Sequence, residues 1–209
     1  VFTGVESKRK KSLSLENQPK LMTVKVESEV LRETQLVVCL LFQYAGMSFV
    51  DFAHLKERNI KNGILDYNRQ KTGTPMRLEI LDTAELMRKE LMGDKRPASG
   101  YLFPFLSGTK TGYEAYLEYN AALSRFNRNL KALKKAAGIA SDVTSYTIRH
   151  SFAMALKEQN VPIEMISELL GHKSIKTTQI YLRSFSLEKM TEVNSTCFGC
   201  VYNYVSKVG

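Results

Sequence analysis

Side chains that could act on a phosphate lie close together near the C-terminal end of the chain. They are Arg149, His150, His172 and Tyr181, all between residues 144 and 183. Attack on a phosphodiester puts extra negative charge on the non-bridging oxygens, so a site for it needs fixed positive donors such as guanidinium and imidazole groups. A tyrosine hydroxyl can attack as nucleophile and keep the phosphate, which conserves the bond energy for rejoining. The residue types therefore favour the breaking and rejoining of a phosphodiester.

The first of three expected helices carries Arg149. Ser145 or Thr147 can cap this helix, because either side chain can accept a hydrogen bond from a free N–H group of the first turn. Its apolar residues recur with the helical period of 3.6 and predict one buried stripe, formed by Ile148, Phe152, Ala155 and Leu156. Arg149 is expected to lie outside this stripe, at the start of the helix.

Two shorter helices follow and hold the other candidates. Pro162 is typical of a first helical residue and Gly171 of the residue after a helix, so His172 is expected at a helix end. Ser174 can cap a third helix, from 175 to about 182, which carries Tyr181. Ordinary structural roles are the alternative: a histidine that binds helix carbonyl groups, and a partly buried tyrosine.

The order and spacing of these residues resemble the tyrosine recombinases, the phage integrase family. The family signature is H-x-x-R-H, then L-G-H, then a Tyr about nine residues beyond that His; the matching segments here are Tyr146 to His150, Leu170 to His172, and Tyr181. The resemblance covers roughly residues 8 to 195. It implies that Arg149 is the second catalytic arginine, His172 the later catalytic histidine and Tyr181 the nucleophile. Tyr146 stands where family members often have His as general base.

Two upstream segments extend the resemblance. The family has a G-L-R-x-x-E box whose Arg is the first of two that clamp the scissile phosphate. Here Ser48 holds the Arg position, which resembles integrases of conjugative transposons, and Asp51 keeps the acidic place. A simple helix cap is the alternative role for Ser48. Lys71 matches the family's catalytic lysine, which lies in a β-hairpin and is a candidate general acid for the leaving 5′ oxygen.

Arg69 is a candidate for the guanidinium group that Ser48 cannot supply. Side chains two residues apart share one face of a strand, so Arg69 and Lys71 should point the same way if a single strand holds both. The alternative is that Arg69 is a solvated strand residue. Arg77 is the next candidate if Arg69 has no such role.

The rest of the chain predicts a mainly α fold with a small antiparallel β-sheet. Apolar residues alternate between 60 and 81 on both sides of a turn with Gly73 and Pro75, which predicts hairpins. Ser14 and Thr83 can cap two of the other helices. Helices are expected at about 14–22, 27–44 (a central core helix), 49–55, 84–92 and 119–137, with a surface loop at 107–113.

The charge of the chain favours a polyanionic partner. Thirty Lys and Arg against 21 Asp and Glu give a net charge of +9, although ribosomal and membrane-surface proteins share this bias. On helix 119–137 the basic residues follow at steps of three and four, which predicts either a solvated face or a track for the DNA backbone. The candidate DNA-binding residues are Arg125, Arg128, Lys131, Lys135 and Lys173.

Three segments are expected along the chain. Residues 1–12 form a basic lead-in or linker, 13–185 the catalytic domain, and 186–209 a C-terminal helix and tail. With 44% hydrophobic residues the 209-residue chain can bury a real core. In the resembled family the C-terminal segment docks on a neighbouring protomer. The alternative is that the apolar residues at the C-terminal end of this chain close its own core.

Neither a cofactor nor a metal ion is expected, because guanidinium and imidazole groups supply the positive charge. Cys39, Cys197 and Cys200 are too few for a disulfide scaffold, and the single C-x-x-C lacks the second pair that a four-ligand zinc site needs. Cys39 is expected to be a reduced, buried thiol. The longest apolar run, 36–42, is far shorter than the roughly 20 residues that span a bilayer. A cytoplasmic protein, bacterial and nucleoid-associated, is the expectation.

The resemblance implies the catalytic domain of a site-specific DNA recombinase, or integrase, that acts through a 3′-phosphotyrosine. Its expected partners are duplex DNA, further copies of itself in a tetramer, and a helical core-binding domain that precedes the catalytic domain in the family. A type IB topoisomerase would share the chemistry but relax supercoils as a monomer. A catalytically dead DNA-binding relic is the alternative from another class, because Ser48 and Tyr146 replace expected residues.

Overall fold

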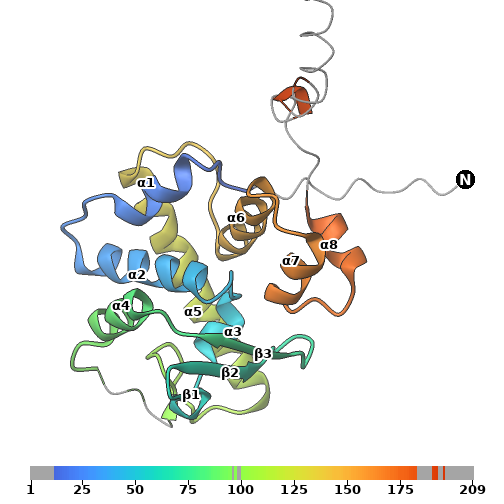
Figure 1. The fold of residues 1–209 in the computed structure, drawn as a ribbon. Coiled ribbons are helices and arrows are strands. Elements are labelled where there is room, and N and C mark those ends of the chain that lie inside the picture. Colours follow the sequence, from blue (N-terminus) through green and yellow to red (C-terminus); the bar gives the residue numbers. More distant parts are fainter. Residues whose placement is uncertain (1–11, 96, 98–99, 183–189, 193–194, 196–209) are drawn as a thin grey trace, which may run out of the picture.

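Helices make up most of the fold, and one small sheet lies at its edge (Figure 1). The computed structural model describes residues 12–95, 97, 100–182, 190–192 and 195. The strands β1 (Ile60–Lys61), β2 (Ile64–Asn68) and β3 (Pro75–Glu79) form an antiparallel sheet in that order. The helices are α1 (Asn17–Thr23), α2 (Glu29–Gln43), α3 (Phe49–Ala53), the 3₁₀ helix η1 (Glu57–Asn59), α4 (Asp82–Met92), α5 (Gly112–Ala136), α6 (Ser145–Glu158), α7 (Ile163–Leu169) and α8 (Ile175–Tyr181). The predicted fold class, mainly α with a small antiparallel sheet, is confirmed.

Helix α2 lies at the centre of the molecule. It packs against α1, α4, α5 and α6, and every residue from 34 to 41 is buried. A helix with neighbours on all sides must be apolar almost all round, which is why its hydrophobic residues are too dense for a surface helix. The expected central core helix is therefore confirmed.

The sheet turns one face to the core and the other to solvent. Leu65 and Tyr67 of β2 are buried, as is Met76, which pairs with Tyr67 across the hairpin. Asp66 of β2 pairs with Arg77 of β3, and both side chains are exposed. This alternation with a period of two is the pattern by which the sequence predicted the sheet. It also places Arg77 on the face that points away from the core.

Two hydrophobic clusters hold the helices. In the larger one, ring stacking joins Phe49 to Phe126 at 4.6 Å between centroids and Phe52 to Phe103 at 4.1 Å. Burying such a side chain contributes roughly 1.5–3 kcal/mol, so these pairs anchor the short helix α3. The smaller cluster joins α6 and α7 and consists of Ala153, Ile166 and Leu170 with the partly buried Phe152, Leu156, Val161 and Leu182.

The start of α6 differs from the prediction. Thr144 is the N-cap, and its side chain accepts a hydrogen bond from the Thr147 N–H while the Thr147 side chain accepts one from the Thr144 N–H. The expected caps, Ser145 and Thr147, lie inside the helix, because this reciprocal capping box satisfies two free N–H groups at once. Arg149 does not leave the buried part of the helix either: it is 5% exposed.

Two other predicted caps are also wrong. Ser14 accepts hydrogen bonds at the start of α1 with its backbone carbonyl group rather than its side chain. Thr83 lies within α4, and its hydroxyl group donates to the side chain of Gln43 instead. Helix α5 begins at Gly112, seven residues earlier than expected, so that the loop predicted at 107–113 is shorter.

Some expectations fall on residues that the structure does not describe. They concern the basic run at 8–11, the C-terminal helix and tail from 187 apart from 190–192 and 195, and Cys197 with Cys200. Cys39 is a buried thiol, as predicted, and burial raises its pKa to about 11. No helix within the described residues is long and apolar enough to cross a membrane.

The core contains one polar group whose removal should stabilise the fold. The Tyr44 hydroxyl is buried and has no hydrogen-bond partner among the described residues, and burial raises the pKa of Tyr44 to about 12. A buried donor without a partner costs roughly 1–3 kcal/mol. We expect Tyr44→Phe to raise the free energy of unfolding, measured in urea, by about 1 kcal/mol.

The pH dependence of this difference has a defined sign. The unfolded parent loses the Tyr44 proton near the ordinary value of 10.0, whereas the folded parent keeps it up to about 12. Parent stability is therefore lost as the pH rises from the first value to the second, and the advantage of the Phe variant should grow over that range. Tyr113→Phe, on the exposed face of α5, is the control and should change nothing. A less stable Tyr44→Phe protein would mean that the hydroxyl has a partner.

Candidate active site

Ser48 occupies the N-cap of α3. Its hydroxyl oxygen accepts a hydrogen bond from the Asp51 N–H (3.4 Å) and donates its proton to Asp51 Oδ2 (2.5 Å). The Asp51 carboxylate is buried, and its Oδ1 accepts from the Gln70 N–H (2.7 Å) in the hairpin turn. The helix-cap role of Ser48 is confirmed. Ser48 also orients a buried carboxylate that ties α3 to the hairpin.

Arg69 is buried directly after β2 ends at Asn68, at 8% exposure. Its Nη1 donates to the carbonyl groups of Leu170 (3.1 Å) and Gly171 (3.0 Å), and its Nε lies 3.5 Å from Asp51 Oδ2. The alternative of a solvated Arg69 is therefore wrong. The condition for a strand face shared with the exposed Lys71 is not met, because both residues lie in the turn beyond the strand.

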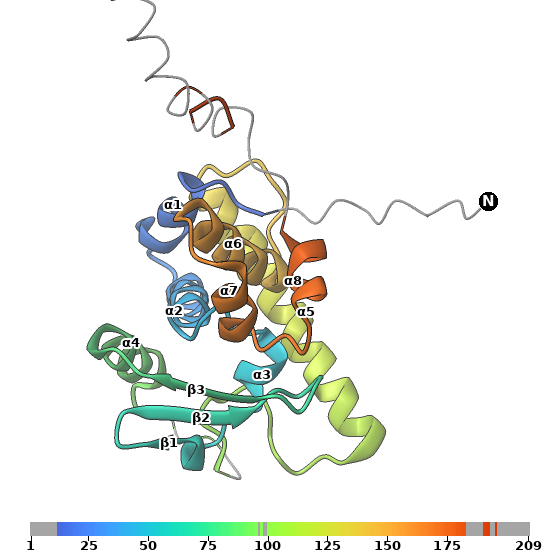
Figure 2. The same cartoon turned by 45° about the vertical axis from the view of Figure 1, so that its right-hand side comes forward.

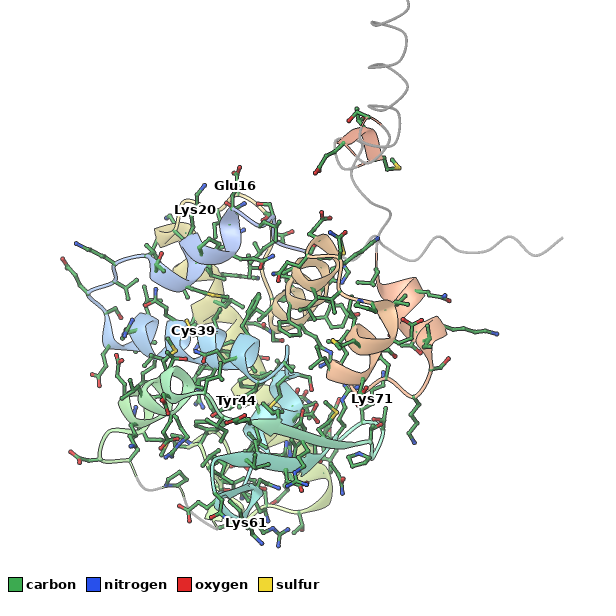
Figure 3. The ribbon with its side chains drawn as sticks, in the orientation of Figure 1. Glu16, Lys20, Cys39, Tyr44, Lys61 and Lys71 are labelled. Atoms are coloured by element: carbon green, nitrogen blue, oxygen red, sulfur yellow. The ribbon has the colours of Figure 1, made fainter. Side chains whose placement is uncertain are left out.

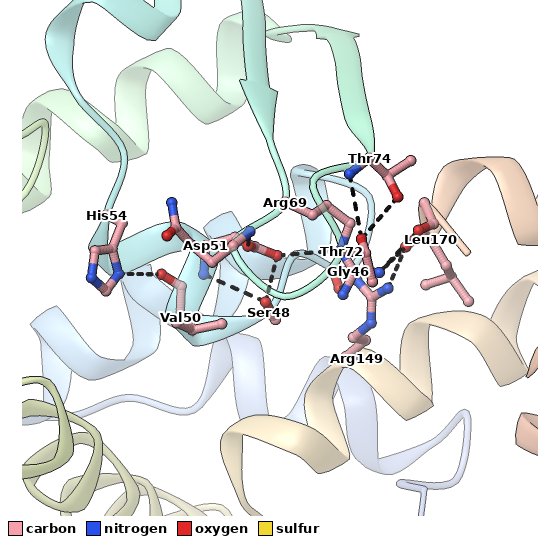
Figure 4. A network of polar contacts seen from close by, with 12 residues as sticks. Gly46, Ser48, Val50, Asp51, His54, Arg69, Thr72, Thr74, Arg149 and Leu170 are labelled. Carbon is pink, nitrogen blue, oxygen red and sulfur yellow. Dashed lines mark hydrogen bonds and ion pairs between the residues drawn. The ribbon is translucent and has the colours of Figure 1, made fainter. Parts of the chain in front are cut away.

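Arg149 reaches the same place from α6. Its Nη1 donates to the Gly46 carbonyl group (2.8 Å), and its Nη2 donates to the carbonyl group of Leu170. The Leu170 oxygen therefore accepts from both Arg149 and Arg69, as Figure 4 shows. The loop after α2 and the hairpin turn thus meet the end of α7, about 100 residues further along the chain, at these two guanidinium groups.

Buried cations outnumber buried carboxylates among the described residues of this site. Asp51 is the one buried carboxylate there, beside the buried Arg69 and Arg149. Within the described residues Arg69 Nη2 has no acceptor. Burial raises the pKa of Tyr67, and the Asp51 charge adds to this while Arg149 and Arg69 oppose it, so the phenol at the wall of the site stays neutral. The site can accept an anion and offers guanidinium donors for it.

Gly171 makes room for this arrangement. Its φ is +60°, and a Cβ atom there would lie 2.4 Å from Met76 Sδ and 2.7 Å from Arg69 Cδ. Any side chain at this position would push Arg69 away from the two carbonyl groups that it binds. The glycine of the L-G-H segment is therefore required by close packing as well as by its left-handed backbone.

His172 and Tyr181 are placed by the last two helices, which lie side by side in Figures 1 and 2. His172 follows α7, its N–H donates to the Ser167 carbonyl group (2.9 Å), and its Nδ1 lies 2.8 Å from Thr178 Oγ1. Tyr181 is the last residue of α8, as predicted, and Ser174 caps that helix. The side chain of Tyr181 lies outside the described residues.

The other candidates are exposed. Tyr146 is 46% exposed in the first turn of α6, one turn before Arg149. Lys71 lies in the hairpin turn, on the side of the molecule that carries α7 and α8 (Figure 3). Lys173 follows His172 and is exposed. The structure thus brings together Arg69, Arg149 and the L-G-H segment, with Lys71 two residues beyond Arg69.

The predicted basic stripe on α5 loses one of its members, Lys134. Arg125, Arg128, Lys131 and Lys135 are exposed, and the last three lie, at 100° per residue, within about 60° of one another round the helix. Arg125 lies further round and lines a hollow of about 370 Å³ between α2 and α5. Lys134 is half-buried and donates to carbonyl groups of the loop that follows α5. It therefore closes the helix end and does not belong to the exposed face.

Sequence reasoning missed several contributors to this site. The carbonyl groups of Gly46 and Leu170 bind the arginines, and backbone acceptors leave no trace in residue type. Thr178 contacts His172 from α8, and its only sequence signal is its place three residues before Tyr181. The exposed, stacked rings of Tyr113 and Tyr116 at the start of α5, 6.1 Å apart, were also not anticipated.

Solved structures define the class to which this fold belongs. The crystal structure of XerA recombinase is similar over 92% of this chain and 66% of its own, with a TM-score of 0.65 and 20% identity. The Tn1549 transposon integrase in complex with a circular intermediate DNA is similar over 90% of this chain and 67% of its own, with a TM-score of 0.66 and 14% identity. The fold is that of the tyrosine recombinase catalytic domains.

Sequence comparison identifies the family. Residues 11–188 match the model of the phage integrase family, and the chain belongs to that family. Tyrosine recombinase XerD of Lacticaseibacillus casei is 52% identical over 54 residues, 26% of this chain and 18% of that protein. Tyrosine recombinase XerC of Rickettsia typhi is 41% identical over 75 residues, 36% of this chain and 24% of that protein. The matched segments thus span a quarter or less of these relatives.

The packing round Gly171 gives a testable expectation. Gly171→Ala combines left-handed backbone strain with displacement of Met76 and Arg69. Gly63→Ala is the matched control, because Gly63 has a φ of +74° and nothing within 4 Å of an added Cβ. In urea unfolding we expect Gly171→Ala to lose about 2 kcal/mol more than Gly63→Ala, the usual cost of overpacking. Equal losses would show that Met76 and Arg69 move aside freely.

Proposed function

We propose that this chain is the catalytic domain of a site-specific DNA recombinase, an integrase, which cleaves and rejoins duplex DNA through a 3′-phosphotyrosine. The observation that carries the proposal is the convergence of the buried Arg69 and Arg149 on one carbonyl group in the L-G-H segment. Buried cations are costly unless anions or hydrogen-bond acceptors compensate them. A phosphodiester fits this place, because its oxygens match the planar fork of a guanidinium group.

Arg69 takes the place of the first family arginine in this proposal. Asp51 and two carbonyl groups fix its Nε and Nη1, while Nη2 is left for a non-bridging phosphate oxygen. Arg149 and His172 provide further donors for the charge that develops during attack. Ser48 acts through Asp51: it caps α3 and orients the carboxylate that holds Arg69.

Tyr181 is the proposed nucleophile. Its oxygen forms a bond to phosphorus as the bond from phosphorus to the 5′ oxygen breaks, and the departing oxygen takes a proton from the Lys71 ammonium group. The Tyr146 hydroxyl group can accept the nucleophile's proton while it passes its own to water, because a phenol is both donor and acceptor. The reverse steps rejoin the strand, and no cofactor takes part in them.

The proposed assembly extends beyond this chain. Contacts to the DNA backbone come from the exposed basic residues Arg128, Lys131, Lys135 and Lys173, with Arg125 beside them. The solved Tn1549 transposon integrase is bound to DNA, which supports duplex DNA as the partner here. We further propose a tetramer on DNA and an N-terminal core-binding domain of the same protein. Residues 1–12 would link to that domain, 13–185 form the catalytic domain and 186–209 dock on a neighbouring protomer, in the bacterial cytoplasm at the nucleoid.

Covalent attachment to DNA tests the function. A nicked suicide substrate loses a short strand after cleavage and traps the protein on the DNA. The parent chain should form this adduct, whereas Tyr181→Phe should bind the same DNA and form none, because only the hydroxyl group is lost. Attachment of the Phe variant would show that another residue is the nucleophile.

The same assay separates the competing functions. A parent protein that binds DNA but gives no adduct would be a DNA-binding relic. An adduct together with relaxation of supercoiled DNA by monomers, without strand exchange between two short duplexes, would indicate a topoisomerase. Exchange between duplexes of one sequence supports the recombinase.

The role of Arg69 gives a further expectation. Losing a preorganised donor to the developing charge slows a reaction by on the order of 10² to 10³, so Arg69→Ala should slow single-turnover cleavage by about that factor. Ser48→Ala should slow it far less, because it removes a cap and one contact to Asp51. Arg77→Ala, on the exposed face of β3, is the matched control and should cleave like the parent. A parent-like rate for Arg69→Ala, with circular dichroism confirming the fold of all variants, would remove Arg69 from the site.

A further inference from the structure

One contact links the imidazole group of the site to the helix that ends in the nucleophile. His172 Nδ1 lies 2.8 Å from the hydroxyl oxygen of Thr178. Thr178 belongs to α8, is fully buried, and lies three residues before Tyr181. Residues three apart lie on neighbouring positions of one helix face. The contact therefore joins the loop after α7 to α8, one helical turn before Tyr181.

The direction of this hydrogen bond follows from the surroundings of Thr178. A buried hydroxyl proton needs an acceptor, because an unpaired one is costly. Within the described residues Thr178 Oγ1 has no partner besides His172. The usual acceptor for a helical threonine is the carbonyl group four residues earlier, here that of Ser174, and Thr178 Oγ1 makes no hydrogen bond to it within the part of the chain that the structure describes. The hydroxyl proton is therefore donated to Nδ1, which must carry a lone pair.

We infer that Thr178 is a positioning residue, which holds the neutral His172 in the tautomer with its proton on Nε2. An imidazole group whose Nδ1 accepts a hydrogen bond carries its remaining proton on Nε2 and can donate it. In the other tautomer Nε2 would be an acceptor and would repel a phosphate oxygen. This role rests on the proposed function, in which His172 donates to the phosphate. Because α8 supplies both Thr178 and Tyr181, the helix that brings the nucleophile also fixes the donor.

Nitrogen NMR reads the tautomer without any DNA. The chain has three histidines, so long-range proton–nitrogen correlations of the ring nitrogens give three sets of signals, and His172→Gln identifies one of them. At pH 8 the parent and Thr178→Ser should have Nε2 protonated, whereas Thr178→Val should shift His172 toward the Nδ1-protonated form. Thr177→Val, the exposed neighbour on α8, should match the parent. A parent with Nδ1 protonated, or a Val variant with an unchanged tautomer, would overturn the inference.

Cleavage of the suicide substrate then tests the consequence. Thr178→Val should slow adduct formation at pH 8 by about fivefold, the rate equivalent of one hydrogen bond of about 1 kcal/mol, with DNA binding unchanged. In a His172→Gln background, Thr178→Val should cost nothing more, because the two changes remove the same donor. Full additivity of the two changes would mean that Thr178 only packs. Absence of cleavage in the parent would refute the proposed function and leave the NMR result to decide the tautomer.

Discussion

The carbonyl group of Leu170 is the point on which the site depends. It accepts hydrogen bonds from two buried guanidinium groups, which reach it from α6 and from the turn after β2. Two like charges so close together repel, and burial adds the loss of their hydration. Carbonyl oxygens and the single carboxylate of Asp51 offset this only in part. The same bonds tie the sheet to α6 and α7, so the elements that hold the charges also hold the domain together.

Most of the fold follows from local patterns in the sequence. The dense apolar residues of α2, the alternation in β2 and β3, and the Pro and Gly at the two ends of α7 each act through neighbours along the chain, so the pattern alone is enough. The ends of helices were less predictable. Thr144 and Thr147 form a reciprocal pair, and several nearby hydroxyl groups could equally have capped α6. Which of them does so depends on the packing of the whole helix.

The site was only partly predictable for a related reason. Arg149, His172 and Tyr181 were singled out by their match to the family signature, and their places on α6, after α7 and at the end of α8 follow from local helix patterns. The burial of Arg69 depends on β2 ending one residue earlier and on carbonyl groups about a hundred positions away. No periodicity in the sequence carries that information. The serine at 48 was likewise ambiguous, because its cap and its contact with Asp51 require the same residue type.

The pairing of Ser48 with Asp51 constrains which substitutions this site can accept. The hydroxyl oxygen lies 2.5 Å from the carboxylate that holds Arg69, so a long side chain introduced at 48 would lose the cap and compete for the same oxygen. An arginine there would put a third cation beside Arg69 and Arg149, while loss of Arg69 alone would leave Asp51 buried without its cation. Positions 48 and 69 are therefore coupled through one carboxylate, so the energetic effects of substitutions at the two positions should not add.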